Sequence, residues 1–534
     1  MNSLSIVILV ICDLYMLLNF KYDIQMLQQN SYRLKRYWRW LKNDIGSMWR
    51  MVDVALLFLL FAANLLPYQV AALVISIVCL TKILLIARRK FKKPLVFTKR
   101  VWRIYSLTGL ITAGGMVALA ICTAGKSGIL NAYTGFQLTL GCILVICIFS
   151  WVFVMLSVLL LSPIERHING RYQKDAERIL RSMPDLKVVG ITGSYGKTST
   201  KHYLHRILSE HFETLMTPGS YNTPMGVIRT VREMMKPYTE VFICEMGAKQ
   251  KGDIKEICDI VNPQMGIITA VGPMHLETFK SIENVQATKF ELADSLPSDG
   301  LIVVNNDFTY CANRKVDNAE CIRYGIDNIK DADYRAENIV YSKNGTSFTI
   351  VSKDGKEYPM KTKLVGECNI SNLIAAVIIS LRLGVPEEKI RYAVSRIDQV
   401  EHRLSMATTP AGVTIIDDAF NSNPAGSKMA IDVLSQFGEQ GRRIIVTPGM
   451  IELGDEQYKL NKEFGRYLGE NVDIAIIVGE YNREAINEGI NESSLGEENL
   501  YNVDSFNEAQ KLLGTMLKSG DTILYENDLP DSFK

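Results

Sequence analysis

The sequence contains no Cys-x-x-Cys pair, although it has ten cysteines among its 534 residues. This absence argues against a zinc ribbon and against a disulfide framework, both of which need closely paired cysteines. No charge of one sign predominates either, because 59 basic residues stand against 57 acidic ones, a net charge of +2. A strongly basic surface is therefore not indicated, and we expect no nucleic-acid partner.

Long apolar runs are confined to the first 165 residues, whereas mixed charge and α/β patterning follow from about Asp175. Five segments approach the roughly 20 apolar residues that a bilayer core requires: residues 4–20, 52–66, 69–87, 105–122 and 136–161. The first has no basic n-region and no small-residue cleavage site, so we interpret it as a retained anchor. The second and third, separated at Pro67, predict a tight helical hairpin. Residues 1–165 are thus predicted to be an α-helical membrane domain with about five spans.

Basic residues are concentrated in two of the connecting segments. Residues 21–50 carry seven and residues 88–103 carry eight, whereas the connection after the fourth span carries only Lys126. Basic loops stay cytoplasmic, which predicts a multi-pass protein of the cytoplasmic membrane with its N-terminus outside and its catalytic domains in the cytoplasm. The Tyr-Trp-Arg-Trp sequence at residues 37–40 indicates either an interfacial amphipathic stretch in contact with membrane lipid or a simple loop near the headgroups.

A glycine loop follows the first strand-like segment after the apolar half. Residues 186–192 are a β-branched run typical of a buried parallel strand, and Leu204, Ile207 and Leu208 lie on one face of the helical pattern beyond the loop. Strand, glycine loop and helix are the context in which backbone N–H groups, a lysine and a threonine bind phosphates and Mg²⁺. The early glycine of the Walker spacing is absent, because Ile191 stands there. From these residues alone, a purely structural turn stays an alternative.

The loop sequence Gly-Ile-Thr-Gly-Ser-Tyr-Gly-Lys-Thr at residues 190–198 resembles the phosphate loop of the Mur ligases. That family includes the folylpolyglutamate synthases, and it lacks the early glycine too. The resemblance extends over about residues 187–534 through further motifs in the family's order. It implies ATP as the cofactor, bound by Gly193, Ser194, Tyr195, Gly196, Lys197, Thr198 and Ser199.

Three further residues are candidates for holding Mg²⁺ together with Thr198. Glu245 ends a buried strand and His275 lies in a Val-Gly-Pro-Met-His-Leu-Glu segment, although a strand-end acid or a lone histidine is more often structural. Within the family pattern both residues match metal ligands. Lys289, which we expect to open a helix, matches a lysine that many members carbamoylate, which converts a cation into an anion beside the metal. Its alternative is a solvent-facing helix lysine.

Residues on both sides of the expected domain boundary match nucleotide and substrate contacts of the family. Asn369 matches an asparagine near adenine, although Cys368 stands where a histidine is usual. Arg403 matches a linker arginine that approaches phosphate as the last domain closes, and Asp418 matches an acid that contacts the nucleotide across the cleft. The substrate candidates lie in a turn-rich stretch and in the motif after Asp418: Asn222, Thr223, Asn421 and Asn423.

The resemblance implies a central P-loop-type ATPase domain over residues 175–404 and a small doubly wound α/β domain over residues 405–534. It also implies an ADP-forming ligase that activates a carboxylate as an acyl phosphate, with Lys197, Lys289, Arg403 and His275 in catalysis. Among Mur ligases the motifs most resemble those of the members that add D-alanyl-D-alanine. The implied substrates are a muramyl-peptide or lipid-linked precursor and an amino acid or dipeptide. Because the spans stand where such members have a UDP-binding domain, we expect either that the acceptor is presented at the membrane on a lipid carrier or that the spans only localise the enzyme.

Three alternatives stay open at this point. The first is amidation of a lipid-linked precursor, although the four-cysteine zinc insertion usual in such proteins is absent. The second is a polyglutamate-type ligase, which shares the ATP motifs. The third is a nucleotide-binding membrane regulator without catalysis.

Overall fold

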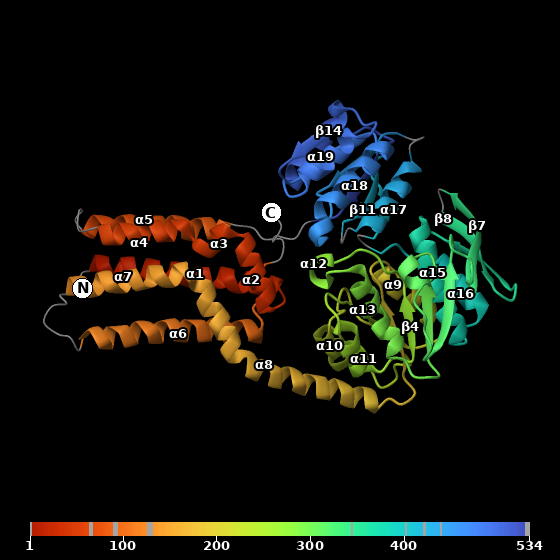
Figure 1. Cartoon of the computed structure of the whole chain (residues 1–534), viewed down its shortest axis with the longest axis horizontal. Coiled ribbons are helices and arrows are strands. Elements are labelled where there is room, and N and C mark those ends of the chain that lie inside the picture. The colour runs from red at the N-terminus through yellow and green to blue at the C-terminus, as the bar shows by residue number, and fades with distance from the viewer. Residues whose placement is uncertain are drawn as a thin grey trace. The chain divides into compact units, whose positions relative to one another are not determined.

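The computed structural model describes residues 3–62, 68–88, 94–124, 132–342, 345–400, 403–419, 423–437 and 441–528. They form two compact units, one built mainly from Met1–Asn169 and the other from Gly170–Leu529 (Figure 1). The division falls inside the long helix α8 (Ser150–Arg181), whose first part belongs to the first unit and whose last part belongs to the second.

The first unit is entirely helical in its described part. Its helices are α1 (Ser3–Gln29), α2 (Leu34–Asn43), α3 (Ile45–Trp49), α4 (Met51–Ala62), α5 (Tyr68–Arg88), α6 (Lys99–Ala124), α7 (Ala132–Ile148) and the start of α8. By length and composition, three of the described helices suffice to cross a membrane, namely Ser5–Gln29, Val70–Arg88 and Ser150–Arg181, and a shorter apolar helix covers Phe136–Ile148.

The helix boundaries differ from the predicted spans: α6 begins six residues before the predicted start at residue 105, and α8 continues to Arg181, beyond the predicted end at residue 161. The first helix continues beyond the predicted end at residue 20 to Gln29, and the predicted fifth span, residues 136–161, is divided between α7 and α8 by a turn at Phe149. Hydropathy does not predict the continuation of α1, because the helix carries Asp23, whose charge is compensated by Arg50. The predicted hairpin at Pro67 and Lys126 lie outside the described residues.

Two buried ion pairs connect the helices of this first unit. Arg50 Nη2 lies 2.8 Å from Asp23 Oδ1, and the Arg50 guanidinium also donates to the side chain of Asn19. Lys82 Nζ lies 2.7 Å from Asp53 Oδ1. Asp23 and Asp53 are both fully buried, so each carboxylate depends on its cation for compensation.

The second unit contains a nine-stranded sheet with the order β2-β3-β1-β4-β5-β6-β7-β8-β9. Its strands are β1 (Lys187–Thr192), β2 (Thr214–Met216), β3 (Val241–Glu245), β4 (Met265–Ile268), β5 (Leu301–Asn305), β6 (Glu320–Gly325), β7 (Tyr334–Ser342), β8 (Gly345–Ser352) and β9 (Glu357–Thr362). The strands from β2 to β7 pair in parallel, and β8 and β9 add an antiparallel extension. Parallel strands bring their carboxyl ends to one edge, where α/β proteins bind ligands.

Helices cover this sheet and supply its hydrophobic core (Figure 1). They are α9 (Lys197–Leu208), α10 (Pro224–Met234), α11 (Asp253–Val261), α12 (Leu276–Phe279), α13 (Ile282–Asp294), α14 (Thr309–Ala312), α15 (Glu367–Arg382) and α16 (Glu387–Ser395). The predicted strand, loop and helix over residues 186–208 are confirmed, and Leu204, Ile207 and Leu208 of α9 are all fully buried.

A second sheet of six strands has the order β10-β11-β15-β12-β13-β14 and is parallel except for β10. Its strands are β10 (Ser405–Thr408), β11 (Thr414–Asp418), β12 (Arg443–Thr447), β13 (Ile474–Val478), β14 (Leu500–Val503) and β15 (Thr522–Glu526). The helices α17 (Pro424–Ser435), α18 (Gln457–Asn471), α19 (Arg483–Asn491) and α20 (Phe506–Met516), with the short turns η1 (Gly454–Glu456) and η2 (Glu497–Asn499), complete this part.

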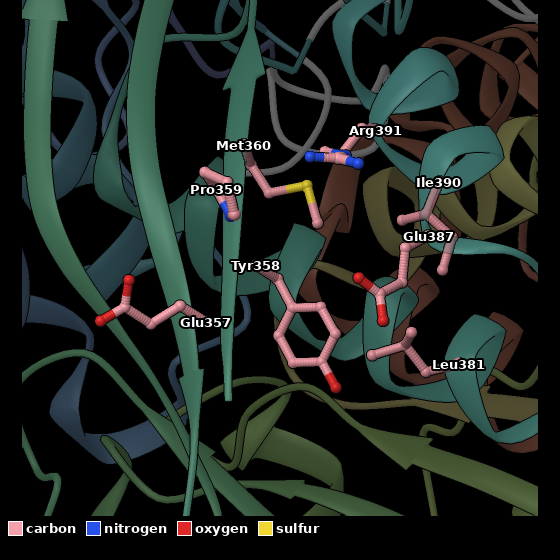
Figure 2. A pocket seen from close by; sticks show the side chains of 8 residues that line it. All are labelled: Glu357, Tyr358, Pro359, Met360, Leu381, Glu387, Ile390 and Arg391. Atoms are coloured by element: carbon pink, nitrogen blue, oxygen red, sulfur yellow. The ribbon is translucent and has the colours of Figure 1, made fainter. Parts of the chain in front are cut away.

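A small cavity lies between β9 and the helices α15 and α16. Figure 2 shows Tyr358 and Met360 pointing from the strand toward Leu381 and Ile390, in accord with the alternating burial along β9. Its volume is about 40 Å³, enough for a few water molecules and far too small for a nucleotide. The candidate site is therefore located from its residues, at the carboxyl edge of the large sheet.

Candidate active site

The glycine loop between β1 and α9 has a backbone that only glycine fits at two points. Gly193 has φ +153°, and a Cβ there would lie 2.0 Å from Thr269 Oγ1. Gly196 has φ +77°, and a Cβ there would lie 2.3 Å from Asn372 Oδ1. The loop is thus held closely between β4 and α15, with Gly196 immediately before the first residue of α9. An N-terminus of a helix preceded by such a loop is a favourable place for an anion.

Lys197 folds back over this loop. Its Nζ donates to the carbonyl oxygens of Gly193 at 2.6 Å and Ser194 at 3.3 Å. The pKa of Lys197 is lowered to about 8, chiefly by burial; the charge of Glu245 opposes this shift and that of Arg403 adds to it. A cation partly stripped of water gains strongly from a nearby anion.

Glu245, at the end of β3, accepts two hydrogen bonds and forms one ion pair. Thr198 Oγ1 and Asn222 Nδ2 donate to Glu245 Oε1 at 3.3 Å and 2.9 Å, and Lys201 Nζ lies 2.9 Å from Oε2. Burial alone would raise the pKa of Glu245, but the charges of Lys201 and Lys197 hold it below its ordinary value. The structure therefore brings Thr198, Asn222 and Glu245 together as candidates, and it adds Lys201, which the sequence motifs do not single out.

His275 and Lys289 lie in a neighbouring group that also includes two residues not predicted for the site. The His275 imidazole contacts the carboxylate of Glu452, which belongs to the second sheet's part, and Lys249 Nζ lies 3.2 Å from Glu452 Oε1. Burial lowers the pKa of His275, and it lowers the pKa of Lys289 well below its usual range. Lys289 is 3% exposed in the middle of α13, so the expectation that it opens a helix is wrong. The metal roles of both residues stay predictions.

The segment before β10 contributes Arg403, and β11 contributes Asp418. Leu404 N donates to Asp418 Oδ1 at 3.2 Å, and Asp418 is the neighbour of Glu526 in the register of β11 and β15. Burial and the charge of Glu526 raise the pKa of Asp418 to about 7, against the effect of Arg403. Burial lowers the pKa of Arg403, while Asp418 and Glu245 oppose this shift. The charges of Asp418 and Glu245, which belong to different sheets, thus both act on the pKa of Arg403.

The asparagine and threonine candidates that the structure describes already have partners within the chain. Asn369 lies inside α15, accepts from Tyr203 Oη at 2.7 Å and donates to the Val365 carbonyl at 2.8 Å. Thr223 and Asn423 are the N-caps of α10 and α17, which explains both residues without a substrate. Asn421 lies outside the described residues. A substrate role for Asn222, Thr223, Asn421 and Asn423 stays a prediction.

Comparison with known proteins decides the family. Residues 191–380 match the Mur ligase middle domain, and residues 402–525 match the Mur ligase glutamate ligase domain. The chain belongs to the Mur ligase family. The matching regions include the glycine loop, Glu245, His275, Lys289, Arg403 and Asp418.

The relatives of this Mur ligase include UDP-N-acetylmuramoyl-tripeptide–D-alanyl-D-alanine ligases. That of Bacillus subtilis is 30% identical over 279 residues, 52% of this chain and 59% of the relative, and that of Escherichia coli is 28% identical over 288 residues, 54% and 63%. The chain thus spans about three fifths of these relatives. Among solved structures, MurF from Acinetobacter baumannii has a TM-score of 0.61 at 25% identity over 67% of this chain and 77% of that one. MurF from Thermotoga maritima in complex with ADP has the same fold, with a TM-score of 0.60 at 24% identity over 67% and 80%.

The residues of this Mur ligase fit Mg²⁺ only as part of a nucleotide complex. Glu245 and Thr198 offer hard oxygen ligands, which Mg²⁺ prefers, but the described residues contain no group of three His, Cys, Asp or Glu side chains that could hold a metal ion. Mg²⁺ is commonly bound by one or two carboxylates together with substrate phosphates and water. One carboxylate beside one hydroxyl therefore suits a phosphate-bound Mg²⁺ and does not suit a cation caged by protein alone.

The pKa of Asp418 predicts a pH dependence of stability. In the unfolded chain this carboxyl titrates near 3.8, whereas in the folded protein it titrates near 7, so the folded state binds more protons between these values. The free energy of unfolding should fall as pH rises from 4 to 7, and Asp418→Asn should remove this contribution. Thermal unfolding of both proteins at pH 4.5, 5.5, 6.5 and 7.5 measures it. A stability difference between them that does not change with pH would contradict the assignment.

Proposed function

We propose that this Mur ligase is an ATP-dependent, ADP-forming carboxylate–amine ligase that adds D-alanyl-D-alanine to a muramyl tripeptide. The carboxylate receives the γ-phosphoryl group and becomes an acyl phosphate, the amine attacks its carbonyl carbon, and the tetrahedral intermediate releases phosphate. The names of the relatives support the substrates, since they are tripeptide–D-alanyl-D-alanine ligases. The shared middle and C-terminal domains support the reaction class.

The observation that carries this proposal is the group of Lys197, Thr198, Glu245 and Arg403 around the glycine loop. Lys197 is a poorly hydrated cation whose pKa is lowered to about 8, and its hydrogen bonds to described residues go to carbonyl oxygens of the loop. Phosphate oxygens are better acceptors for such a cation than neutral carbonyls. Arg403, from the segment before β10, interacts electrostatically with Glu245. In this proposal its charge neutralises negative charge that develops during phosphoryl transfer.

The chain's residues act by positioning and charge, without a covalent enzyme nucleophile. Lys197 orients the transferred phosphoryl group, and the backbone N–H groups at the start of α9 bind the other phosphates of ATP. Glu245 and Thr198 hold Mg²⁺ in this proposal, and when bound the ion neutralises charge on the phosphate oxygens. Asp418 and Asn369 also contact the nucleotide in this proposal, as the resemblance to the family implies.

In this proposal the reaction takes place at the cytoplasmic face of the membrane, where the helical unit anchors the ligase. Three helices long and apolar enough to cross a membrane support it, together with the basic segments between the predicted spans. An acceptor carried on a lipid would meet the ligase there, whereas a UDP-linked acceptor would arrive from solution. An experiment therefore has to compare acceptors on both carriers, UDP and lipid.

Phosphate release from ATP by the full-length protein in lipid nanodiscs tests the proposal. We expect release only when a muramyl tripeptide and D-alanyl-D-alanine are both present with Mg²⁺, and a mass increase of the acceptor by one dipeptide residue. UDP-linked and lipid-linked acceptors are compared at equal concentration, each with D-alanyl-D-alanine, single amino acids, glutamate or ammonia.

Each other outcome has a distinct meaning. Release that needs glutamate indicates a polyglutamate-type ligase, and release that needs ammonia indicates amidation. Hydrolysis that ignores every acceptor and amine, or no hydrolysis in a protein that still binds ATP, would contradict the ligase and favour a nucleotide-binding regulator.

A further inference from the structure

Lys201 is a lysine with no exposed surface, one turn after Lys197 in α9. Its Nζ lies 2.9 Å from Glu245 Oε2 and donates to the Gly219 carbonyl oxygen at 2.6 Å. Glu245 is only 1% exposed, so the pair lies entirely within the protein. A buried ammonium without an anion is very unfavourable. Lys201 is thus held by Glu245 and by the turn that precedes α10.

The two oxygens of Glu245 have different surroundings. Oε1 accepts from Thr198 Oγ1 at 3.3 Å and from Asn222 Nδ2 at 2.9 Å, so it lies beside the glycine loop. Oε2 forms an ion pair with the Lys201 ammonium at 2.9 Å and accepts no hydrogen bond from the described residues. One carboxylate oxygen of Glu245 therefore lies beside the Thr198 hydroxyl, and the other is paired with the Lys201 ammonium.

We propose that Lys201 is a positioning residue that withholds Oε2 of Glu245 from a cation, so that Glu245 offers a single oxygen beside Thr198. The inference rests on the proposed function, in which Mg²⁺ accompanies the nucleotide. Mg²⁺ is small and is bound by few carboxylate oxygens, whereas Ca²⁺ is larger and readily takes both oxygens of one carboxylate. Lys201 therefore selects Mg²⁺ over Ca²⁺ at this site.

The charge of Lys201 supports the same selection. With Glu245 paired, the site has less net negative charge than a free carboxylate would give it, and a cation is retained mainly through the phosphates of the nucleotide. The hydrogen bond to Gly219 keeps the ammonium in place, because it links Nζ to a second element. Removing the ammonium would free Oε2 and leave both oxygens available to one ion.

Binding of Mn²⁺ in the presence of ADP, followed by electron paramagnetic resonance, tests this selection without turnover. The full-length protein is used in nanodiscs, and Mg²⁺ or Ca²⁺ is added to displace Mn²⁺. In the wild type, Mg²⁺ should displace Mn²⁺ more effectively than Ca²⁺ does. The ratio of the two effects should be larger for the protein–ADP complex than for free ADP. In Lys201→Met this preference should move toward Ca²⁺ by about tenfold or more.

Two matched variants distinguish this role from a general structural one. Lys201→Arg keeps a cation against Oε2 and should retain most of the preference for Mg²⁺. Lys255→Met removes a lysine of α11 that is 60% exposed and paired with Asp259, and it should leave the preference unchanged. A shift in Lys201→Met with retention in the other two variants supports the inference.

The inference and the proposed function fail in different ways. No binding of Mn²⁺ with ADP by the wild type would contradict the proposed nucleotide site itself. Binding with no more preference for Mg²⁺ than free ADP shows, or an unchanged preference in folded Lys201→Met, would overturn the role of Lys201 alone. If Lys201→Met does not unfold cooperatively, the wild-type comparison with free ADP and the same measurement on Lys201→Gln decide the question.

Discussion

Lys197→Ala is expected to reduce acceptor-dependent phosphate release by a factor of at least about 100, because the Lys197 ammonium lies against the glycine loop and donates to two of its carbonyl oxygens. Its ammonium is poorly hydrated in the folded protein, with a pKa lowered to about 8, so its interaction with a phosphate is stronger than that of a surface lysine. The loss should fall mainly on kcat/KM for ATP. Steady-state phosphate release across a range of ATP concentrations measures it.

Lys187→Ala is the matched control for this effect. Lys187 is the exposed first residue of β1, ten positions before Lys197 on the same strand–loop–helix unit. Its loss removes an equal charge without touching the loop, so activity should stay within about twofold of the wild type. Comparable losses in both variants, or retained activity in a folded Lys197→Ala protein, would show that phosphate binding lies elsewhere.

The local part of this site is readable from sequence because its residues are close along the chain. Gly193, Gly196 and Lys197 follow one buried strand, and the periodicity of Leu204, Ile207 and Leu208 predicts the helix that begins there. The structure confirms the strand and the helix. The glycine requirement also follows from local geometry, since both glycines have positive φ.

Contacts between distant segments are what the sequence does not reveal. Lys201 and Glu245 meet because β1 and β3 are neighbours in the sheet, although 44 residues separate them. The contact of His275 with Glu452 depends on how a loop after β4 meets a turn before η1, with 177 residues between them. Single-sequence patterns carry no information on such pairing, so a buried lysine such as Lys201 looks like any other helix lysine.

The position of Lys289 illustrates a related limit. Its motif suggests a helix start, yet the helix begins seven residues earlier at Ile282, with Ser281 as its N-cap. A serine followed by a polar turn is a common cap, but boundaries are the least certain part of a helix prediction. The consequence is that Lys289 lies within a packed helix face and is almost completely buried, which an assignment to a helix end does not suggest.

Ion pairing within the helical unit is likewise invisible to hydropathy. Asp23 lies in α1, 27 residues from Arg50 at the end of α3, and hydropathy registers both only as interruptions of apolar sequence. Their pairing explains why α1 continues past the predicted end of the first span. Ionisable groups inside a membrane helix are costly, and they persist where a partner compensates them.

Arg50→Met is expected to destabilise the helical unit by about 3–5 kcal/mol, because it leaves the fully buried Asp23 carboxylate without its cation. Arg50 Nη2 lies 2.8 Å and 2.9 Å from the two oxygens of Asp23, and the hydroxyl of Ser150 contacts the same carboxylate. A single hydroxyl does not replace the guanidinium. Thermal unfolding in detergent, followed by intrinsic fluorescence, measures the loss.

Adding ADP identifies the transitions, because a nucleotide stabilises only the unit that binds it. The unfolding transition whose midpoint temperature ADP does not change is assigned to the helical unit. Arg50→Met should lower the midpoint temperature of this transition. The double variant Asp23→Leu with Arg50→Met removes both charges and should recover much of the loss, because buried pairs are often replaceable by apolar side chains. Lys35→Met, at an exposed position of α2, should have little effect. If the single and double variants unfold at the same temperature, the Asp23–Arg50 pair does not compensate charge, and the helical packing around it is what stabilises this unit.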